Sequence, residues 1–155
     1  MKCAGRWAAI AIGIGITMGL IPVEPGYAAD KEHEPTCTLE TLQGRYLFAN
    51  SGVLLPPSFG VTEPTSAANA AGFYIFHGDS TVTTIATAVI NGDTVLENAV
   101  IPSSYTVNAD CTGTLTVPNG PSFGMFIAPN GEAIAFIGAD PGNQVSYIAR
   151  RVSRK

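Results

Sequence analysis

Short apolar or alternating runs of residues, separated at close intervals by strong turn sequences, make up almost all of the chain after residue 41. The runs span residues 42–50, 72–76, 81–90, 94–101, 104–109, 114–117, 122–128, 132–138 and 145–152. Turn sequences such as Asn91-Gly92 and Asn130-Gly131 stand between them, and they reverse a chain because Asn and Gly tolerate positive φ. The pattern predicts a meander of antiparallel strands.

The alternation inside the runs supports this prediction. In residues 104–109, Tyr105 and Val107 share one face of an extended chain and Thr106 lies on the other, as a half-buried strand requires. Helical spacing is absent from the sequence, and residues 67–71 are expected to form one turn at most. Short hairpins favour a closed barrel over a sandwich. We therefore predict an all-β fold, a single antiparallel up-and-down, calycin-like β-barrel of about eight strands.

The length of 155 residues leaves room for one domain. We expect the barrel over residues 42–155, after a charged lead-in at residues 29–41 that lacks core-forming side chains and is expected to be flexible. The longest connection between runs, residues 53–71, contains three prolines, Pro56, Pro57 and Pro64. It is the candidate for a lid across one opening of the barrel.

Residues 1–28 have the pattern of a secretory signal peptide, with a positively charged start followed by the apolar run 7–21. That run is shorter than the roughly 20 residues needed to span a bilayer, and Pro22 ends it. Small residues favour cleavage after Ala28, with cleavage after Ala29 or an uncleaved anchor as the alternatives. The sequence thus predicts a secreted or periplasmic protein without stable membrane insertion once the signal is removed.

Removal of the signal peptide also removes Cys3 and leaves two cysteines, Cys37 and Cys111. An even pair in an exported protein indicates a disulfide, whereas two buried thiols are the alternative. The loop closed by this bond is long, and the chain-entropy model assigns such a loop roughly 4 kcal/mol of stabilisation.

The charge distribution excludes several classes of partner. Residues 46–149 contain no Lys or Arg and carry only carboxylates, which repel a phosphate backbone, so no nucleic-acid partner is expected. No pair of Cys or His has zinc spacing, and the glycines within residues 1–28 do not form a dinucleotide-binding motif. We therefore predict neither a metal nor a cofactor.

Glu97 is the one carboxylate that the strand pattern places beside apolar side chains. If residues 94–101 form a regular strand, Val95, Glu97 and Ala99 share one face. In a dry cavity the pKa of Glu97 would rise, which suits a general acid or base or a hydrogen-bonding contact for a ligand. The alternative is that the opposite face, with Leu96, points inward and Glu97 is solvated.

Aromatic residues are spread over nearly every run, and most of them must belong to the core. Residues 81–90, however, carry Ala86 and Ala88 on one face and Thr83 and Thr87 on the other, so whichever face points inward is narrow. An eight-stranded barrel with small side chains on one wall leaves room for one small ligand. The residues expected to line the interior and bind the ligand are Tyr46, Phe48, Tyr74 and Tyr105, with Glu97 as the polar contact.

Two segments carry a resemblance to known proteins. Cys37 followed by Leu42-Gln43-Gly44-Arg45-Tyr46, and later the segment SYTVNADCTGT at residues 104–114, are similar to uncharacterised secreted bacterial proteins that resemble the allene oxide cyclase-like, calycin-type barrels. The resemblance implies a barrel with an apolar cavity. In the relatives that are enzymes, this cavity folds a reactive hydrophobic substrate for cyclisation, mostly by its shape. Export and the cysteine pair depart from the plant enzymes.

Three hypotheses about function follow. The leading one is a secreted barrel that binds a small apolar molecule in its interior. The second is a cavity-templated cyclase or isomerase in which Glu97 transfers a proton. The third is a filled barrel that serves as a structural or surface-interaction module. No oligomeric state is predicted.

Overall fold

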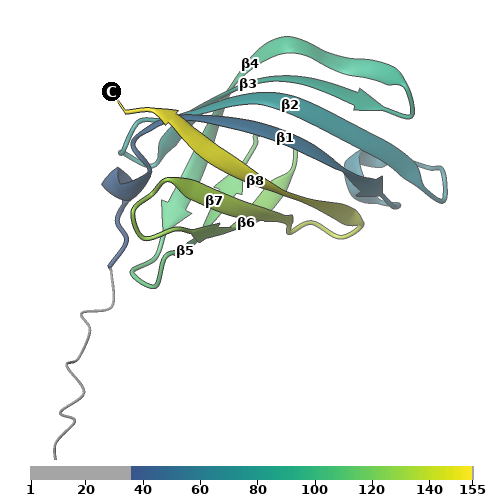
Figure 1. The fold of residues 1–155 in the computed structure, drawn as a ribbon. Helices are drawn as coiled ribbons and strands as arrows, with labels where there is room; N and C mark the ends of the chain where they lie inside the picture. The colour runs from purple at the N-terminus through teal and green to yellow at the C-terminus, as the bar shows by residue number, and fades with distance from the viewer. Residues whose placement is uncertain (1–35, 155) are drawn as a thin grey trace, which may run out of the picture. The chain divides into compact units, whose positions relative to one another are not determined.

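The computed structural model describes residues 36–154, and the predicted signal peptide and residues 29–35 of the lead-in lie outside the described residues. Eight antiparallel strands close into one up-and-down barrel, because each strand pairs with its neighbours in the chain and β1 pairs with β8 (Figure 1). The strands are β1 (Gly44–Leu54), β2 (Ser66–Phe76), β3 (Thr81–Ile90), β4 (Asp93–Val107), β5 (Thr112–Thr116), β6 (Ser122–Ile127), β7 (Ala133–Gly138) and β8 (Asn143–Ser153). The predicted all-β barrel is confirmed.

Two short 3₁₀ helices accompany the strands, η1 (Leu39–Leu42) before β1 and η2 (Ser58–Gly60) between β1 and β2. In the described part of the chain, no helix has the length and apolar character required to cross a membrane.

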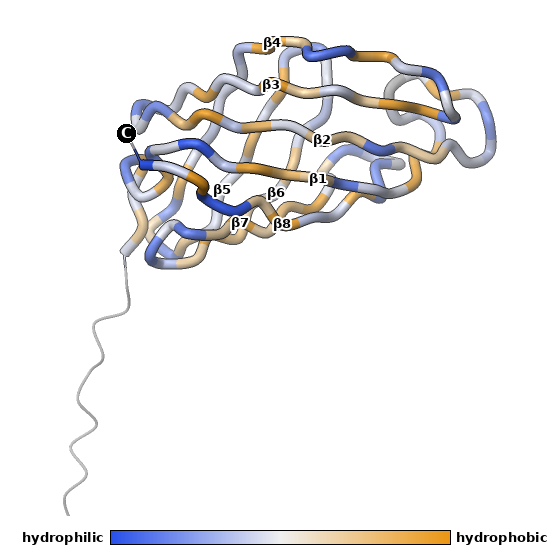
Figure 2. The backbone as a smooth tube through the Cα atoms, turned by 45° about the horizontal axis from the view of Figure 1, so that its top comes forward, coloured by the Kyte–Doolittle hydropathy of each residue, from blue (hydrophilic) through white to orange (hydrophobic). Residues whose placement is uncertain are grey.

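The strands alternate between buried and exposed positions, and β8 does so over eight consecutive residues. Figure 2 shows hydrophobic and hydrophilic positions mixed along each strand, as expected when one face of a sheet covers a core and the other meets water. The inward positions are mainly aromatic: Tyr46, Phe76 and Tyr105 are nearly inaccessible to solvent. The core is therefore built from large rings contributed by different strands.

Two segments differ from the sequence prediction. Residues 94–101 and 104–109 are one strand, β4, which continues through Pro102 because a proline removes only one donor from the ladder. Residues 67–71, expected to form one turn at most, belong to β2 because they pair with β1 on one side and with β3 on the other. The predicted lid is consequently shorter, and the connection between β1 and β2 spans only residues 55–65.

The strands differ in length around the barrel, so the two ends of the barrel differ. Strands β1 to β4 contain 10 to 15 residues, whereas β5, β6 and β7 contain 5 or 6. We call the end where β1 starts and β2 stops the closed end, and the end where β1 stops and β2 starts the open end. The long strands extend beyond the short ones toward the open end (Figure 1).

Helix η1 lies across the closed end, and the predicted disulfide between Cys37 and Cys111 fastens it there. The backbone N–H of Cys37 donates to the carbonyl of Ala109 at 3.2 Å, and the hydroxyl of Tyr105 donates to the carbonyl of Leu39 at 3.1 Å. Residues 36–41, which the sequence assigned to a flexible lead-in, are therefore part of the folded barrel, because these contacts and the disulfide attach them to it.

Candidate functional site

A cavity of about 360 Å³ lies at the open end of the barrel. Its wall comes from β1 to β4, β6, β8 and the turn between β5 and β6. The lining residues are Phe48, Asn50, Leu54, Ala68, Asn69, Ala70, Tyr74, Thr84, Ala86, Ala88, Val89, Ile90, Val95, Leu96, Ile101, Val117, Pro118, Asn119, Gly120, Pro121, Phe123, Asn143 and Val145. None of these residues carries a charge, and most are apolar.

Small side chains on two adjacent strands explain why this part of the barrel is hollow. Ala68 and Ala70 on β2 and Ala86 and Ala88 on β3 all line the cavity. In the β2–β3 ladder Ala70 lies directly opposite Ala88, so a methyl group faces a methyl group where the closed end has aromatic rings. An eight-stranded barrel is normally filled by its inward side chains, and four alanines leave that space vacant.

Aromatic residues form the floor of the cavity. Phe48 stacks on Tyr74 with ring centroids 4.4 Å apart, and the hydroxyls of Tyr74 and Tyr147 form a hydrogen bond of 2.7 Å. Burial raises the pKa of Tyr74 and of Tyr147 well above that of an ordinary tyrosine, so both phenols are neutral. The floor is therefore uncharged, and its rings are packed against one another.

The polar groups of the wall are neutral as well. Four asparagines, Asn50, Asn69, Asn119 and Asn143, are among the lining residues together with Thr84. The Thr84 hydroxyl lies 3.3 Å from the hydroxyl of Ser103 in a buried pair. An apolar wall with a few neutral hydrogen-bonding groups is typical of sites for small uncharged molecules.

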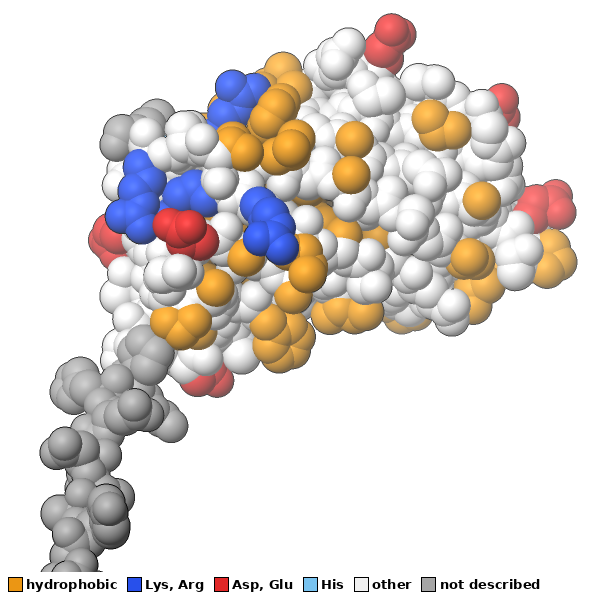
Figure 3. Space-filling model, viewed as in Figure 1, with side chains coloured by type: hydrophobic (Ala, Val, Ile, Leu, Met, Phe, Trp, Pro, Cys, Tyr) orange, Lys and Arg blue, Asp and Glu red, His pale blue; other side chains and the backbone are white. Residues whose placement is uncertain are grey.

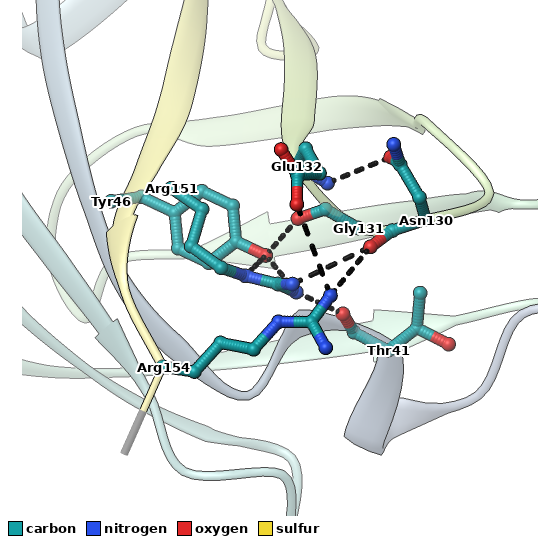
Figure 4. Close-up of polar contacts among 7 residues, drawn as sticks. All are labelled: Thr41, Tyr46, Asn130, Gly131, Glu132, Arg151 and Arg154. Atoms are coloured by element: carbon teal, nitrogen blue, oxygen red, sulfur yellow. Dashed lines mark hydrogen bonds and ion pairs between the residues drawn. The ribbon is translucent and has the colours of Figure 1, made fainter.

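Of the aromatic residues that the sequence indicates, Phe48 and Tyr74 line this cavity, whereas Tyr46 and Tyr105 lie at the closed end. Tyr46 and Phe48 point to the same face of β1, but two residues of a strand span about 7 Å, which places them at different heights in the barrel. The Tyr46 hydroxyl donates to the carbonyl of Gly131 and accepts hydrogen bonds from Arg151 at 2.7 and 3.0 Å (Figure 4). Tyr46 therefore serves the packing of the closed end.

For Glu97 the structure agrees with the alternative stated in the sequence analysis, in which Glu97 is solvated and Leu96 points inward. The side chain of Glu97 is exposed, and Glu97 is not among the lining residues. The register between β3 and β4 shifts on both sides of Ala88, and Asn98 adopts a φ of 45° with its N–H donating to the Thr87 hydroxyl at 3.1 Å. Such bulges break the alternation of a strand. The consecutive residues Val95 and Leu96 both line the cavity as a result.

The sequence reasoning missed the turn at residues 117–121 and Asn143, the first residue of β8, both of which line the cavity. Turn sequences mark reversals but do not reveal which turn folds over an opening. The connection predicted as a lid lies beside the turn before β8, because the N–H of Leu55 donates to the carbonyl of Gly142 at 2.8 Å, and residues 55–58 and 60–65 are not among the described residues that line the cavity.

A second, polar hollow of about 270 Å³ lies at the closed end, beside Arg151. The Arg151 guanidinium donates to the carbonyls of Thr41 and Asn130, besides the Tyr46 hydroxyl, so protein groups already engage all three of its nitrogens (Figure 4). Arg154 lies 3.9 Å from Glu132 in an exposed ion pair. The arrangement is that of a structural network.

Among residues 36–154, no cluster of three or more His, Cys, Asp or Glu side chains has the geometry to hold a metal ion. No family model, no curated protein and no solved structure matches this chain. Functional inference for the protein therefore rests on the geometry and chemistry of the cavity.

Proposed function

We propose that this protein is an exported barrel that binds one small, neutral, apolar molecule in the cavity at its open end. The observation that carries the proposal is a cavity of about 360 Å³ whose lining residues are uncharged and mostly apolar. Cavities of about 300 to 1,000 Å³ are the usual size for small-molecule sites. Burial of the apolar surface of the ligand, at about 25 cal/mol per Å², is the driving force.

Export is part of the proposal. The disulfide between Cys37 and Cys111 is compatible with a protein that folds in an oxidising compartment outside the cytoplasm. The signal peptide predicted at residues 1–28 supplies the route. Intact mass of the secreted protein tests this part, since cleavage after Ala28 yields a chain that begins at Ala29.

The two alternative functions have less support. The cyclase hypothesis gave Glu97 the proton transfer, but Glu97 is exposed and does not line the cavity. The lining residues offer a proton only from neutral hydroxyls, and the raised pKa of Tyr74 makes it a weak acid. Catalysis stays a prediction without a specific observation in its favour. A filled structural barrel disagrees with the vacant space beside Ala86 and Ala88.

Titration with 1-aminoanthracene, a neutral apolar fluorophore, tests the proposal. We expect saturable binding with one site per chain, a blue-shifted emission and a Kd in the micromolar range. Ala86→Leu and Ala88→Leu each place a larger side chain inside the cavity and should weaken binding at least 10-fold. Ala135→Leu is the matched control, because Ala135 is exposed on the outer face of β7, and it should bind as the unmodified protein does.

Equal binding by Ala88→Leu and Ala135→Leu would show that the fluorophore occupies some other site and would contradict the proposal. Native mass spectrometry of the protein purified from its own host provides an independent test. A bound small molecule that is lost in Ala86→Leu supports the proposal, and repeated absence of any adduct opposes it.

A further inference from the structure

Large apolar side chains gather on the outer wall of the barrel and do not line the cavity. In the described chain eight such side chains are exposed, and five of the eight belong to the adjoining strands β6, β7, β8 and β1. We call these five residues, which are between 46% and 60% exposed, the outer patch: Leu47, Phe126, Ile137, Ile148 and Val152. Apolar side chains exposed singly are ordinary, whereas a contiguous group of them marks an interaction surface.

The strand pairing makes the outer patch contiguous. Ala135 on β7 lies directly opposite Phe126 on one side and Ile148 on the other, so only a methyl group separates the two larger side chains. Ile137 follows Ala135 by two residues and projects from the same face of β7. Leu47 on β1 is a diagonal neighbour of Ile148 across the β1–β8 pair. The outer patch therefore extends across four adjoining strands.

The charged groups on this face all have one sign. Strands β1, β2, β6, β7 and β8 contain no Asp or Glu, and their exposed charged residues are Arg45 and Arg150. Arg150 lies opposite Leu47, and the guanidinium of Arg45 lies 3.7 Å from the centroid of the Phe73 ring. In the described part of the chain, neither arginine forms an ion pair with a carboxylate. Figure 3 shows hydrophobic and basic side chains next to one another on this side of the molecule.

We propose that the outer patch binds to the surface of an anionic lipid bilayer. The headgroup region of a bilayer accepts apolar side chains, which removes their exposed surface from water. Arg45 and Arg150 donate to lipid phosphates beside the patch, because a guanidinium pairs well with phosphate oxygens and an anionic surface attracts basic residues. The contact is peripheral, and it uses side chains of the outer wall that do not line the cavity.

Other occupants fit this face less well. A peptide or a helix is normally bound in a groove, whereas no residue of the outer patch lines either of the two hollows described above. A second copy of the chain, docked through the same face about a two-fold axis, would bring Arg45 and Arg150 of both copies together without a carboxylate of that face to offset the repulsion. A bilayer surface adapts to a convex wall and supplies the negative charge that the face lacks.

Flotation with lipid vesicles tests the proposal on the exported chain with its disulfide formed. The probes are vesicles of phosphatidylcholine alone and vesicles of phosphatidylcholine and phosphatidylglycerol in equal amounts, both at low salt. We expect about fivefold more protein to float with the anionic vesicles. This excess should fall when the salt concentration is raised to about 0.5 M, because salt screens the attraction between arginine and phosphate.

Two pairs of variants locate the contact. Ile148→Ser should reduce flotation with the anionic vesicles about fivefold, since it removes an apolar side chain from the centre of the patch. Val100→Ser is the matched control, because Val100 is also a β-branched residue and is 66% exposed, but it lies on β4 outside the patch. The double variant Arg45→Gln with Arg150→Gln should remove the preference for anionic vesicles, whereas the same two positions changed to Lys should retain it.

Several outcomes would overturn the proposal. These are equal flotation with both kinds of vesicle, no flotation with either, and flotation of Ile148→Ser equal to that of Val100→Ser. Analytical ultracentrifugation without lipid tests the second copy: a dimer that Ile148→Ser dissociates and that ignores vesicles would assign the face to self-association instead. Ile148→Ser should still bind 1-aminoanthracene, so this inference and the proposed function can fail independently.

Discussion

The two ends of the barrel are built from the same strands but have opposite chemistry. At the closed end a disulfide, helix η1 and the hydrogen bonds of Arg151 and Tyr46 join distant parts of the chain. At the open end four alanines and uncharged asparagines are among the residues around vacant space. Figure 3 shows basic side chains gathered near the end of β8, at the closed end. The comparison indicates that the contacts joining distant segments gather at one end, and that the other end holds the cavity to which we assign binding as a proposal.

The size of the inward side chains produces this difference. Strand β2 runs from Ala68 and Ala70 at the open end to Tyr74 and Phe76 toward the closed end, and all four residues face the interior or its rim. Large rings fill the barrel where they meet, with Phe76 and Tyr105 at a centroid distance of 4.8 Å. Packing therefore weakens gradually from one end of the same strand to the other.

The largest expected effect concerns the disulfide at the closed end. Replacement of both Cys37 and Cys111 with Ala should lower the free energy of unfolding by about 4 kcal/mol, because the bond closes a loop with a sequence separation of 74 residues. Urea unfolding followed by tyrosine fluorescence measures this loss. Reduction of the unmodified protein should give the same loss. At urea concentrations below the unfolding transition, the double variant should still bind 1-aminoanthracene. Loss of this binding would mean that the cavity at the open end depends on the disulfide at the closed end.

Alkaline pH tests the aromatic floor that separates the two ends. Burial raises the pKa of Tyr74 and Tyr147 in the folded protein, so their contribution to stability is complete below pH 10 and is lost as the pH rises above it. At pH 11 the loss should reach about 1.4 kcal/mol for each of the two tyrosines. Urea unfolding at pH 8 and pH 11 measures it.

The control for the alkaline experiment is the double variant Tyr74→Phe with Tyr147→Phe, which removes both hydroxyls of the pair together. Its stability should depend less on pH over the same range. An equal decline in the double variant would assign the effect to groups other than the floor.

Tyr46→Phe should lower the free energy of unfolding by about 2 kcal/mol, since the buried hydroxyl is a partner of both Arg151 and the carbonyl of Gly131. Arg154→Met is the control at the same end: its ion pair with Glu132 is exposed, and its loss should change stability by less than about 1 kcal/mol. Thermal and urea unfolding of the two variants provide the comparison. Equal effects would mean that the buried network contributes no more than a surface ion pair.

The smallest expected effect is that of Glu97→Gln at the open end. Because Glu97 is exposed and does not line the cavity, the variant should bind 1-aminoanthracene with a Kd within about twofold of the unmodified value. Fluorescence titration measures this. A 10-fold or larger increase in this Kd would show that Glu97 contributes to binding. It would contradict the distinction between a neutral cavity and a charged exterior.

Much of the fold was predictable because its signals are local. The turn sequences and the alternation of side chains gave eight strands and their order, except where β4 continues through Pro102 and where residues 67–71 extend β2. The site was less predictable. Phe48 and Tyr74 were indicated as wall residues and do line the cavity, but Tyr46 points to the same face and lies outside it. Facing inward is a local property, whereas height along the barrel depends on how all the strands are staggered.

The bulges of β4 illustrate the same limit. A regular strand would have put Glu97 beside Val95 and Ala99, but the register with β3 shifts near Ala88 and Asn98 takes a positive φ. Only the partner strand supplies the hydrogen bonds that fix such a shift. The sequence of β4 alone gives no sign of it.

By itself, the sequence determined the extended strands, the turns between them and the only pair of cysteines left once the predicted signal peptide is removed, because each depends on residue type and short-range spacing. The tertiary structure alone decided which end of the barrel is hollow. It placed the alanines of β2 opposite those of β3 and brought Asn143 of β8 to the same cavity. A cavity exists only where side chains from distant segments fail to fill a common space, and no single segment contains that information.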